Sequence, residues 1–294
     1  MISLMRKKVL VTGASGFIGQ HFISKTSEFD VIEVDLLQKN VDEVNFSEAN
    51  AVLHLAAYVH QMKGGDPDNY FKVNRDLAFE VAKKAKLQNV KQFIFMSTVK
   101  VYGEYTENGC WDEETECNPQ DPYGKSKLEA EKLIMGLKDE NFEVAIVRSP
   151  LVYGEGVRAN MLNLIKLVDK FPVLPLGNIQ NKRAMVFIDN LISIFHQIIK
   201  KQLGGIFIPT DDKSLSTTEL VQLIAENLNK KSILINANCT LRPLLFFKPQ
   251  LVIRLFRSLC LNNEKSKRNY DLNIPFTVEL GIKRTVDWYK STNE

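Results

Sequence analysis

The sequence has few cysteines and no long uncharged apolar run. Its 294 residues include four cysteines, Cys110, Cys117, Cys239 and Cys260, and none of them form a CxxC pair. Close cysteine pairs mark metal and redox sites, so we expect no metal and four free thiols, as in a reducing cytoplasm. A membrane-spanning helix takes about 20 predominantly apolar residues. No uncharged run approaches that length, so we predict no membrane span.

The sequence also lacks an excess of charge of either sign. Its 38 Lys and Arg residues nearly balance 35 Asp and Glu residues, which leaves a net charge of +3. The basic residues are scattered, whereas nucleic-acid-binding proteins concentrate them on one surface. We therefore expect no nucleic-acid partner. With 45% hydrophobic and 25% charged residues, the remaining composition is that of a globular protein with one large or two smaller domains.

The first half of the sequence alternates short apolar runs with helical repeats. Strands are predicted at residues 8–11, 31–34, 51–55, 92–96 and 144–147. Residues 70–87 repeat an apolar side chain every four positions, which predicts a helix with one apolar face. Such alternation is typical of an α/β fold in which helices cover both faces of a doubly wound parallel sheet. Residues 35–51 are too few for a full crossover helix.

Three glycines, spaced three apart, follow the first predicted strand. Gly13 would permit a sharp turn, Gly16 would let backbone N–H groups approach phosphates, and Gly19 would let a helix lie close to the strand. Asp35 ends the second predicted strand about twenty residues further on, where a carboxylate suits the ribose hydroxyls of NAD and repels a 2′-phosphate. The pattern predicts a Rossmann-type dinucleotide site for NAD, with NADP left open.

The pattern changes after Pro150. We predict that residues 1–150 form the NAD(P)-binding domain and that a helix at 189–202 packs back onto it. Residues 151–188 and 203–294, with a short strand at 206–208, are predicted to form a smaller C-terminal α/β substrate-binding region. The stretch 241–261 mixes Leu and Phe with Arg and Lys. Two interpretations stay open for it, namely packing over the substrate cleft or a partner, and peripheral contact with a membrane surface.

A tyrosine and a lysine at the start of a predicted helix could carry acid/base chemistry. Tyr123 and Lys127 are four residues apart, so both lie on one helix face. The pKa of a phenol is about 10, and a neighbouring ammonium group lowers it toward a useful range. Thr98 ends the fourth predicted strand, where a parallel sheet places ligand-facing groups. We expect Thr98 to orient a substrate hydroxyl toward Tyr123.

Taken together, these motifs resemble the extended short-chain dehydrogenase/reductases, in particular the nucleotide-sugar epimerase/dehydratase family. The matching segments are residues 12–19, 54–57, 71–74, 93–103, 122–127 and 148–154. The resemblance implies that Thr98, Tyr123 and Lys127 are catalytic. The cofactor site that it implies, together with the glycine motif, consists of Gly13, Ser15, Gly16, Phe17, Ile18, Gly19, Asp35, Leu55, Ala56, Ala57, Asn74, Ser97, Tyr123 and Lys127. The substrate site comprises Thr98, Tyr123, Asn160 and Arg183.

The resemblance implies redox chemistry at C4 of a UDP-hexose. Dehydratases of the family carry an Asp-Glu pair after the threonine, whereas Val99 and Lys100 follow Thr98 here, which argues against 4,6-dehydration. Residues 151–156 and Asn160 resemble enzymes of bacterial surface-polysaccharide synthesis, which favours a UDP-N-acetyl-6-deoxyhexosamine 4-ketoreductase. The alternative is a UDP-glucose or UDP-N-acetylglucosamine 4-epimerase, which recycles tightly bound NAD and suits Asp35.

Two further expectations complete the sequence-based interpretation. A remote alternative is a non-catalytic NAD-binding sensor, but a sensor has no need to keep Thr98, Tyr123 and Lys127 together. The family resemblance also implies a cytoplasmic homodimer that pairs through the helices predicted at residues 70–87 and 123–135.

Overall fold

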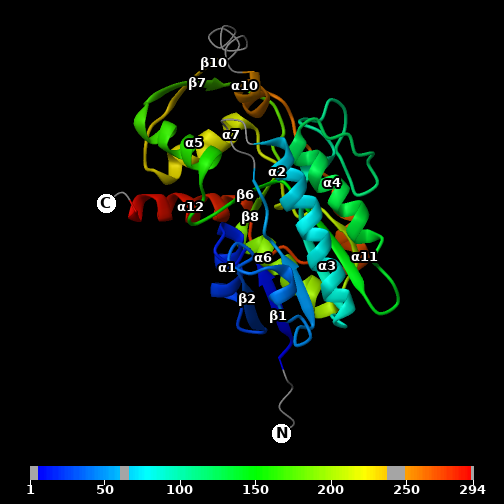
Figure 1. Ribbon diagram of the computed structural model, residues 1–294. Coiled ribbons are helices and arrows are strands. Elements are labelled where there is room, and N and C mark those ends of the chain that lie inside the picture. The colour runs from blue at the N-terminus through cyan, green and yellow to red at the C-terminus, as the bar shows by residue number, and fades with distance from the viewer. Residues whose placement is uncertain (1–5, 60–65, 237–248, 293–294) are drawn as a thin grey trace.

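A six-stranded parallel sheet lies at the centre of the molecule (Figure 1). The computed structural model describes residues 6–59, 66–236 and 249–292. The strand order is β2-β1-β3-β4-β5-β9. Their bounds are β1 Lys8–Thr12, β2 Asp30–Val34, β3 Ala51–His54, β4 Gln92–Thr98, β5 Glu143–Ser149 and β9 Gly205–Phe207. This arrangement confirms the predicted Rossmann-type α/β fold.

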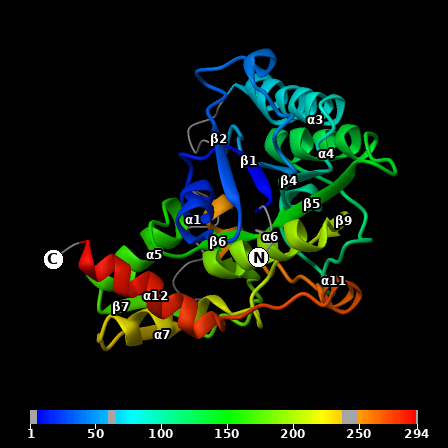
Figure 2. The ribbon, with the colours of Figure 1, turned by 90° about the horizontal axis from the view of Figure 1, so that it is seen from below.

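Helices cover both faces of the sheet because successive strand side chains point to opposite sides. In β1, Val9 and Val11 join the core beneath α1 (Phe17–Lys25) and α6 (Ile188–Lys201). Leu10 joins the opposite core beneath α3 (Ala78–Leu87) and α4 (Pro122–Met135). Figure 2 shows these two helix layers on either side of the strands. The fully apolar strands of the sequence are therefore buried on both faces.

The connections differ in helical content. Between β2 and β3 lies only one short 3-10 turn, η1 (Val41–Glu43). This agrees with the expectation that residues 35–51 are too few for a full crossover helix. The helix predicted at 70–87 is present but not uniform. It runs through α2 (Pro67–Phe71), a π-helical turn η2 (Lys72–Leu77) and α3. π-Helical turns occur mostly as single-turn bulges within α-helices and are frequent at functional sites, and η2 buries Asn74.

A smaller region lies beyond the carboxyl ends of the main strands. Here α5 (Ala159–Lys170), α7 (Thr217–Asn227) and α12 (Val278–Ser291) group together, away from α3 and α4 (Figure 1). Two parallel strand pairs, β7 with β10 and β6 with β8, accompany them. Their bounds are β6 Leu151–Tyr153, β7 Val173–Gly177, β8 Met185–Phe187 and β10 Ile233–Asn236. The helices α10 (Pro249–Phe256) and α11 (Glu264–Tyr270) precede α12.

Two segments after Pro150 return to the main sheet. The helix α6 packs beside α1, where the Phe22 and Phe195 rings meet edge to face with centroids 6.3 Å apart. The strand predicted within the smaller region also extends the main sheet, because β9 pairs in parallel with β5 and sets Gly205 against Ala145. A three-residue apolar run carries no signal for which sheet it joins.

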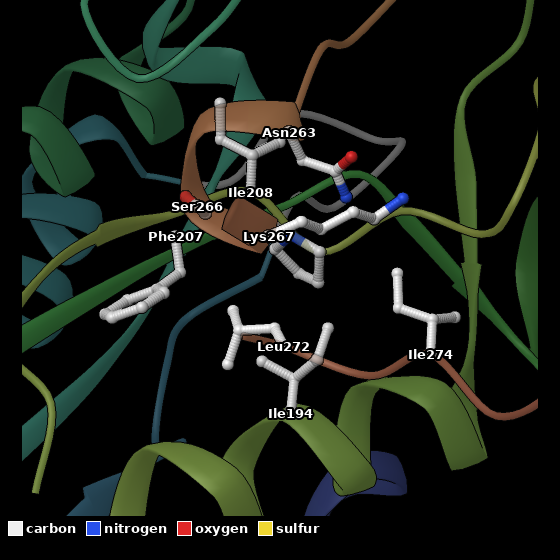
Figure 3. A pocket seen from close by; sticks show the side chains of 9 residues that line it. Ile194, Phe207, Ile208, Asn263, Ser266, Lys267, Leu272 and Ile274 are labelled. Atoms are coloured by element: carbon white, nitrogen blue, oxygen red, sulfur yellow. The ribbon is translucent and has the colours of Figure 1, made fainter. Parts of the chain in front are cut away.

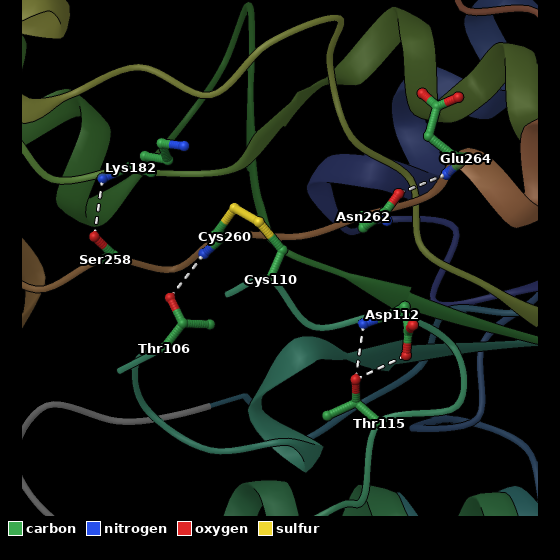
Figure 4. The surroundings of a disulfide bond; sticks show 9 residues. All are labelled: Thr106, Cys110, Asp112, Thr115, Lys182, Ser258, Cys260, Asn262 and Glu264. Carbon is green, nitrogen blue, oxygen red and sulfur yellow. Dashed lines mark hydrogen bonds between the residues drawn. A yellow bond between two sulfur atoms is a disulfide. The ribbon is translucent and has the colours of Figure 1, made fainter. Parts of the chain in front are cut away.

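The prediction of four free thiols was wrong. Cys110 and Cys260 form a disulfide across a sequence separation of 150 residues (Figure 4). The segment around Cys260 lies against the loop after β4, where Thr106 N donates to Ser258 O and Trp111 N donates to Cys260 O. Only the tertiary fold brings these segments together, so no spacing rule could pair the cysteines. Cys117 is free, and Cys239 lies outside the described residues.

The stretch 241–261 is only partly described, because residues 241–248 lie outside the described ranges. In the remainder, Leu255 and Phe256 pack against the main core, and Arg254 donates to Asn160 Oδ1 at 3.1 Å. This part therefore packs on the molecule beside α5. None of the helices in the described residues is long and apolar enough to cross a membrane.

Candidate active site

The glycine motif forms a tight cradle between β1 and α1. Gly13 has a φ of +70°, and a Cβ there would lie 2.7 Å from Ala56 N. A Cβ on Gly19 would lie 2.5 Å from Gly13 O, which is closer than real Cβ contacts allow. Gly16 is the N-cap of α1, so it lies where backbone N–H groups point out of the helix and bind anions. The close backbone contacts explain why glycine stands at positions 13 and 19, and the approach of Gly16 to phosphates stays a prediction.

The other predicted cofactor residues surround this cradle. Leu55, Ala56 and Ala57 are half-buried just after β3, and Phe17 and Ile18 are half-buried in the first turn of α1. Ser15 and Asp35 are exposed. Asp35 directly follows β2, and its Oδ1 accepts from Leu37 N at 2.9 Å. The backbone leaves no room for a Cβ at Gly13 or Gly19, and the exposed carboxylate of Asp35 follows the neighbouring strand. This arrangement fits a bound dinucleotide.

A buried histidine supports this loop. His54 Nδ1 lies 2.9 Å from Thr12 Oγ1, and Ala56 N donates to the same hydroxyl at 3.4 Å. Burial, with a smaller contribution from the nearby Lys127 charge, lowers the pKa of His54 to about 3. The ring is therefore neutral at physiological pH and joins β1 to the turn after β3. In the sequence, His54 stands out only by its position in the segment 54–57, which resembles the family.

Lys127 points from α4 into the molecule. Its Nζ donates to Met96 O at 2.8 Å and lies 4.4 Å from the centroid of the Phe95 ring. The side chain is buried, and this burial lowers the pKa of Lys127 to about 7 although Glu131 opposes the change. Lys127 thus lies against β4, the strand that ends at Thr98. The ammonium has two remaining protons for a ligand at the sheet edge.

Tyr123 and Thr98 come from adjoining backbones. A Cβ on Gly124, the residue after Tyr123, would lie 2.7 Å from Lys100 O, which is two residues after Thr98. The first turn of α4 therefore rests directly on the 3-10 turn η3 (Val99–Val101) that follows β4. Thr98 is buried, and its Oγ1 accepts from Lys100 N at 3.3 Å. The structure thus places the start of α4 beside the end of β4.

The pKa of Tyr123 differs from the sequence-based expectation. Burial raises it, and the charges of Asp121 and Tyr70 raise it further. The predicted lowering by Lys127 does not accompany these effects, and Lys127 Nζ instead donates to Met96 O. Without a ligand, the phenol is therefore protonated at neutral pH.

Asn74 acts through other residues. Its Oδ1 accepts from Tyr58 N at 2.8 Å, and its Nδ2 donates to Tyr58 O at 3.0 Å and to Ser126 Oγ at 3.2 Å. The side chain therefore fixes the loop after Ala57 against α4, between Tyr123 and Lys127. The cofactor contact that the resemblance implied for Asn74 stays a prediction, and the hydrogen bonds show that its side chain holds the loop after Ala57 in place.

A buried ionic network begins at Glu131, one helical turn after Lys127 on α4. No sequence motif predicted this network. Glu131, one turn after Lys127, accepts two hydrogen bonds from the Arg148 guanidinium at 2.6 and 3.0 Å, and it accepts from Ser97 Oγ. Arg148 also donates to Tyr102 OH at 2.9 Å. These contacts join α4 to β4 and β5. The cofactor contact expected of Ser97 stays a prediction. The available signal was the four-residue step from Lys127 to Glu131.

Two arginine side chains, Arg183 and Arg254, interact where the resemblance implied substrate binding, and the backbone of Arg257 adjoins them, with its guanidinium over the Tyr105 ring. Arg183 donates to Arg257 O at 3.2 Å, and Arg254 binds Asn160 as described above. Burial, followed by the repulsive charge of Arg254, lowers the pKa of Arg183 to about 10. Clustered guanidinium groups favour a bound polyanion. The sequence indicated Asn160 and Arg183 but missed Arg254 and Arg257, which lie about seventy positions later.

A small apolar cavity lies elsewhere, between α6, β9 and α11 (Figure 3). Its volume of about 10 Å³ has room for about one water molecule. The side chains of Ile194, Phe207 and Leu272 contribute to its wall. No predicted site residue lines this cavity, so it is separate from the candidate active site.

Comparison with known proteins agrees with this geometry. Residues 9–207 match the NAD dependent epimerase/dehydratase family. The chain is 34% identical over 319 aligned residues to a UDP-glucose 4-epimerase from Vibrio cholerae, covering 98% of this chain and 97% of that protein. It is 27% identical to an N-acetyl-alpha-D-glucosaminyl-diphospho-ditrans,octacis-undecaprenol 4-epimerase from Escherichia coli O157:H7, covering 77% and 74% of the two chains.

Solved structures share the fold at lower identity. A UDP-glucuronic acid 4-epimerase from Bacillus cereus in complex with NAD aligns with a TM-score of 0.77 and 20% identity, covering 98% of this chain and 100% of that one. A dTDP-4-dehydrorhamnose reductase from Clostridium acetobutylicum aligns with a TM-score of 0.78 and 21% identity, covering 96% and 99%. The fold and site define a nicotinamide-dependent enzyme of the short-chain dehydrogenase/reductase superfamily. The chain belongs to the NAD dependent epimerase/dehydratase family.

Proposed function

We propose that the enzyme interconverts C4 epimers of a UDP-hexose with NAD as a tightly held cofactor. The relative from Vibrio cholerae, which matches nearly the whole chain, supports C4 epimerisation of a UDP-hexose. The exposed Asp35 supports NAD, because its carboxylate repels a 2′-phosphate. The observation that carries the proposal is the buried Lys127 on the same helix as Tyr123, with its Nζ bound to Met96 O near the carboxyl end of β4.

Each residue of the site has a separate task. Tyr123 takes the proton from O4 of the sugar and returns it, and Thr98 orients O4 by a hydrogen bond. Lys127 binds the nicotinamide ribose, where its positive charge favours the phenolate of Tyr123. Bound NAD supplies the acceptor and donor of hydride for C4. Arg183, with the charge of Arg254 close to it, binds the diphosphate of the nucleotide.

The test is a turnover assay without added cofactor. Purified wild-type protein is incubated with UDP-glucose or UDP-N-acetylglucosamine, and the products are separated. Formation of the C4 epimer supports the proposal. Tyr123→Phe is the matched variant, and we expect its turnover to fall by roughly 10² to 10⁴ while NAD still binds. Equal turnover by this variant would remove Tyr123 from the mechanism.

A 4-ketoreductase is the second candidate function. Residues 151–156 and Asn160 favour it, since they resemble enzymes that act on UDP-N-acetyl sugars. It uses the same proton and hydride positions but consumes one reduced cofactor per turnover. Loss of NADH or NADPH only when a UDP-4-keto sugar is present, with no epimer formed in the first assay, would establish the reductase instead. NAD binding with neither activity would establish the remote alternative, a sensor.

A further inference from the structure

Lys100 lies where the end of β4 meets the start of α4. It belongs to η3, two residues after Thr98, and three quarters of its side chain is buried. Its Nζ donates to Glu104 Oε1 at 2.7 Å and pairs with Asp121 Oδ2. Both carboxylates are four fifths buried, at 20% and 19% exposure. Lys100 therefore joins η3 to the residue that precedes α4.

Asp121 links this ion pair to Tyr123. It is the N-cap of α4, and its Oδ1 accepts from Gly124 N at 2.7 Å while Oδ2 faces Lys100. Tyr123 lies between Asp121 and Gly124 in the sequence, so its backbone belongs to the turn that this cap holds. The backbones also touch, since a Cβ on Gly124 would lie 2.7 Å from Lys100 O. One carboxylate thus holds both the first turn of the helix and the lysine.

The charges around Tyr123 give this ion pair an electrostatic effect. Asp121 raises the pKa of Tyr123, next to burial, and Tyr70 from α2 raises it further. On α4 itself, Lys127 lies one turn later, and the Arg75–Glu129 pair lies beyond it. From η3 and the following turn come Lys100 and Glu104. A carboxylate beside a phenol opposes phenolate formation, and a cation paired with that carboxylate offsets the opposition.

We propose that Lys100 is a positioning residue for Tyr123, which neutralises the N-cap carboxylate of Asp121 and fixes the first turn of α4 beside Thr98. The proposal rests on the proposed function, in which Tyr123 exchanges the proton on O4. Lys100 occupies the second position after the catalytic threonine. The ammonium group of Lys100 acts on the Tyr123 phenol through the Asp121 carboxylate, which both pairs with Lys100 and caps α4.

The test is the pH profile of kcat/KM for four variants. In Lys100→Met the Asp121 charge is no longer offset, so the apparent pKa of the essential base should rise by about one pH unit, and kcat/KM at neutral pH should fall about tenfold. Lys100→Arg should restore the wild-type profile. Asn caps helices as well as Asp does, so Lys100→Met combined with Asp121→Asn should return the profile to near wild type. The matched control is Lys125→Met, an exposed lysine in the same turn.

A second readout separates this inference from the proposed function. Phenolate formation is followed by near-ultraviolet absorbance of the cofactor-free proteins, made with a fluorinated tyrosine whose more acidic phenol titrates while the proteins stay folded. The trace of Tyr123→Phe is subtracted to isolate position 123. Lys100→Met should shift this titration upward, and the double variant should reverse the shift. An unchanged titration and pH profile in Lys100→Met, with Tyr123→Phe inactive, would overturn the role of Lys100 alone. Full activity of Tyr123→Phe would overturn the proposed function, and the titration would still decide the effect of Lys100.

Discussion

At the scale of single residues, Lys127 shows how burial changes a charged group. Its ammonium keeps one backbone acceptor, Met96 O, and the face of Phe95. These contacts do not replace the water lost on burial, so the pKa falls from 10.5 to about 7. The four-residue spacing from Tyr123 was enough to predict that both residues share a helix face. The pKa of Tyr123 is raised and that of Lys127 is lowered, both mainly by burial in the tertiary fold, which local spacing does not encode.

Burial of Lys127 predicts a pH-dependent stability of the cofactor-free protein. Between about pH 7 and pH 10.5 the unfolded chain holds this proton and the folded chain does not. The free energy of unfolding should therefore rise with pH across this window, by at most about 1.4 kcal/mol per pH unit. Lys127→Met should remove this part of the slope. Urea unfolding of both proteins across the window measures it, and identical slopes would show that the buried ammonium is not the cause.

At the scale of elements, the glycine motif was the most predictable part of the site. A strand, three spaced glycines and a helix require only local sequence, and β1, the cradle and α1 follow in that order. The arginine cluster shows the opposite case. Arg257 and Arg183 meet because the segment at 257–262 pairs with residues near 183, with Ala184 N donating to Leu259 O at 2.8 Å. Such long-range pairing leaves no periodic signal.

The cradle predicts unequal effects of two alanine substitutions. Gly13 and Gly109 both have a φ of +70°, but a Cβ on Gly109 meets nothing within 4 Å. Both Gly→Ala changes therefore carry the backbone strain of a positive φ, of about 1 kcal/mol. Only Gly13→Ala also forces a Cβ against Ala56 N. Gly13→Ala should weaken NAD binding at least tenfold by calorimetry, and Gly109→Ala should not. Equal affinities would mean that the cradle does not contact the cofactor.

At the scale of the whole molecule, the parallel sheet and its two helix layers were predictable because each strand is apolar on both faces. The boundary of the smaller region was less predictable, since β9 returns to the main sheet and pairs with β5. The disulfide was not predictable, because its cysteines lie 150 residues apart. It joins the loop after β4 to the segment that carries Arg257.

Removal of the disulfide should destabilise the oxidised protein. Cys110→Ser should lower the free energy of unfolding by about 2–5 kcal/mol, since the bond closes a long loop in the unfolded chain. Cys117→Ser removes a free thiol and is the matched control. Denaturant unfolding of both variants, with and without a thiol reductant, measures the effect. A Cys110→Ser protein as stable as the oxidised wild type would show that the bond does not form in solution.

A proposed homodimer through α3 and α4 predicts an effect of charge on the outer faces of these helices. Leu87 and Leu133 are large apolar side chains with 72% and 41% exposure. Leu87→Glu combined with Leu133→Glu should yield a monomer in sedimentation analysis, because burial of two carboxylates opposes association. Leu37→Glu, at 97% exposure on the turn after β2, is the control. A dimer that survives the double change would place the interface elsewhere.

The central claim is that Tyr123 and Lys127 serve hydride transfer at C4 of a UDP-hexose. It is tested most directly with UDP-hexose that carries deuterium at C4, incubated with wild type and Tyr123→Phe without added cofactor. The account predicts that wild type forms the C4 epimer with its deuterium retained, and that the variant forms almost none. Loss of the label to water during epimerisation, or equal conversion by the variant, would contradict it.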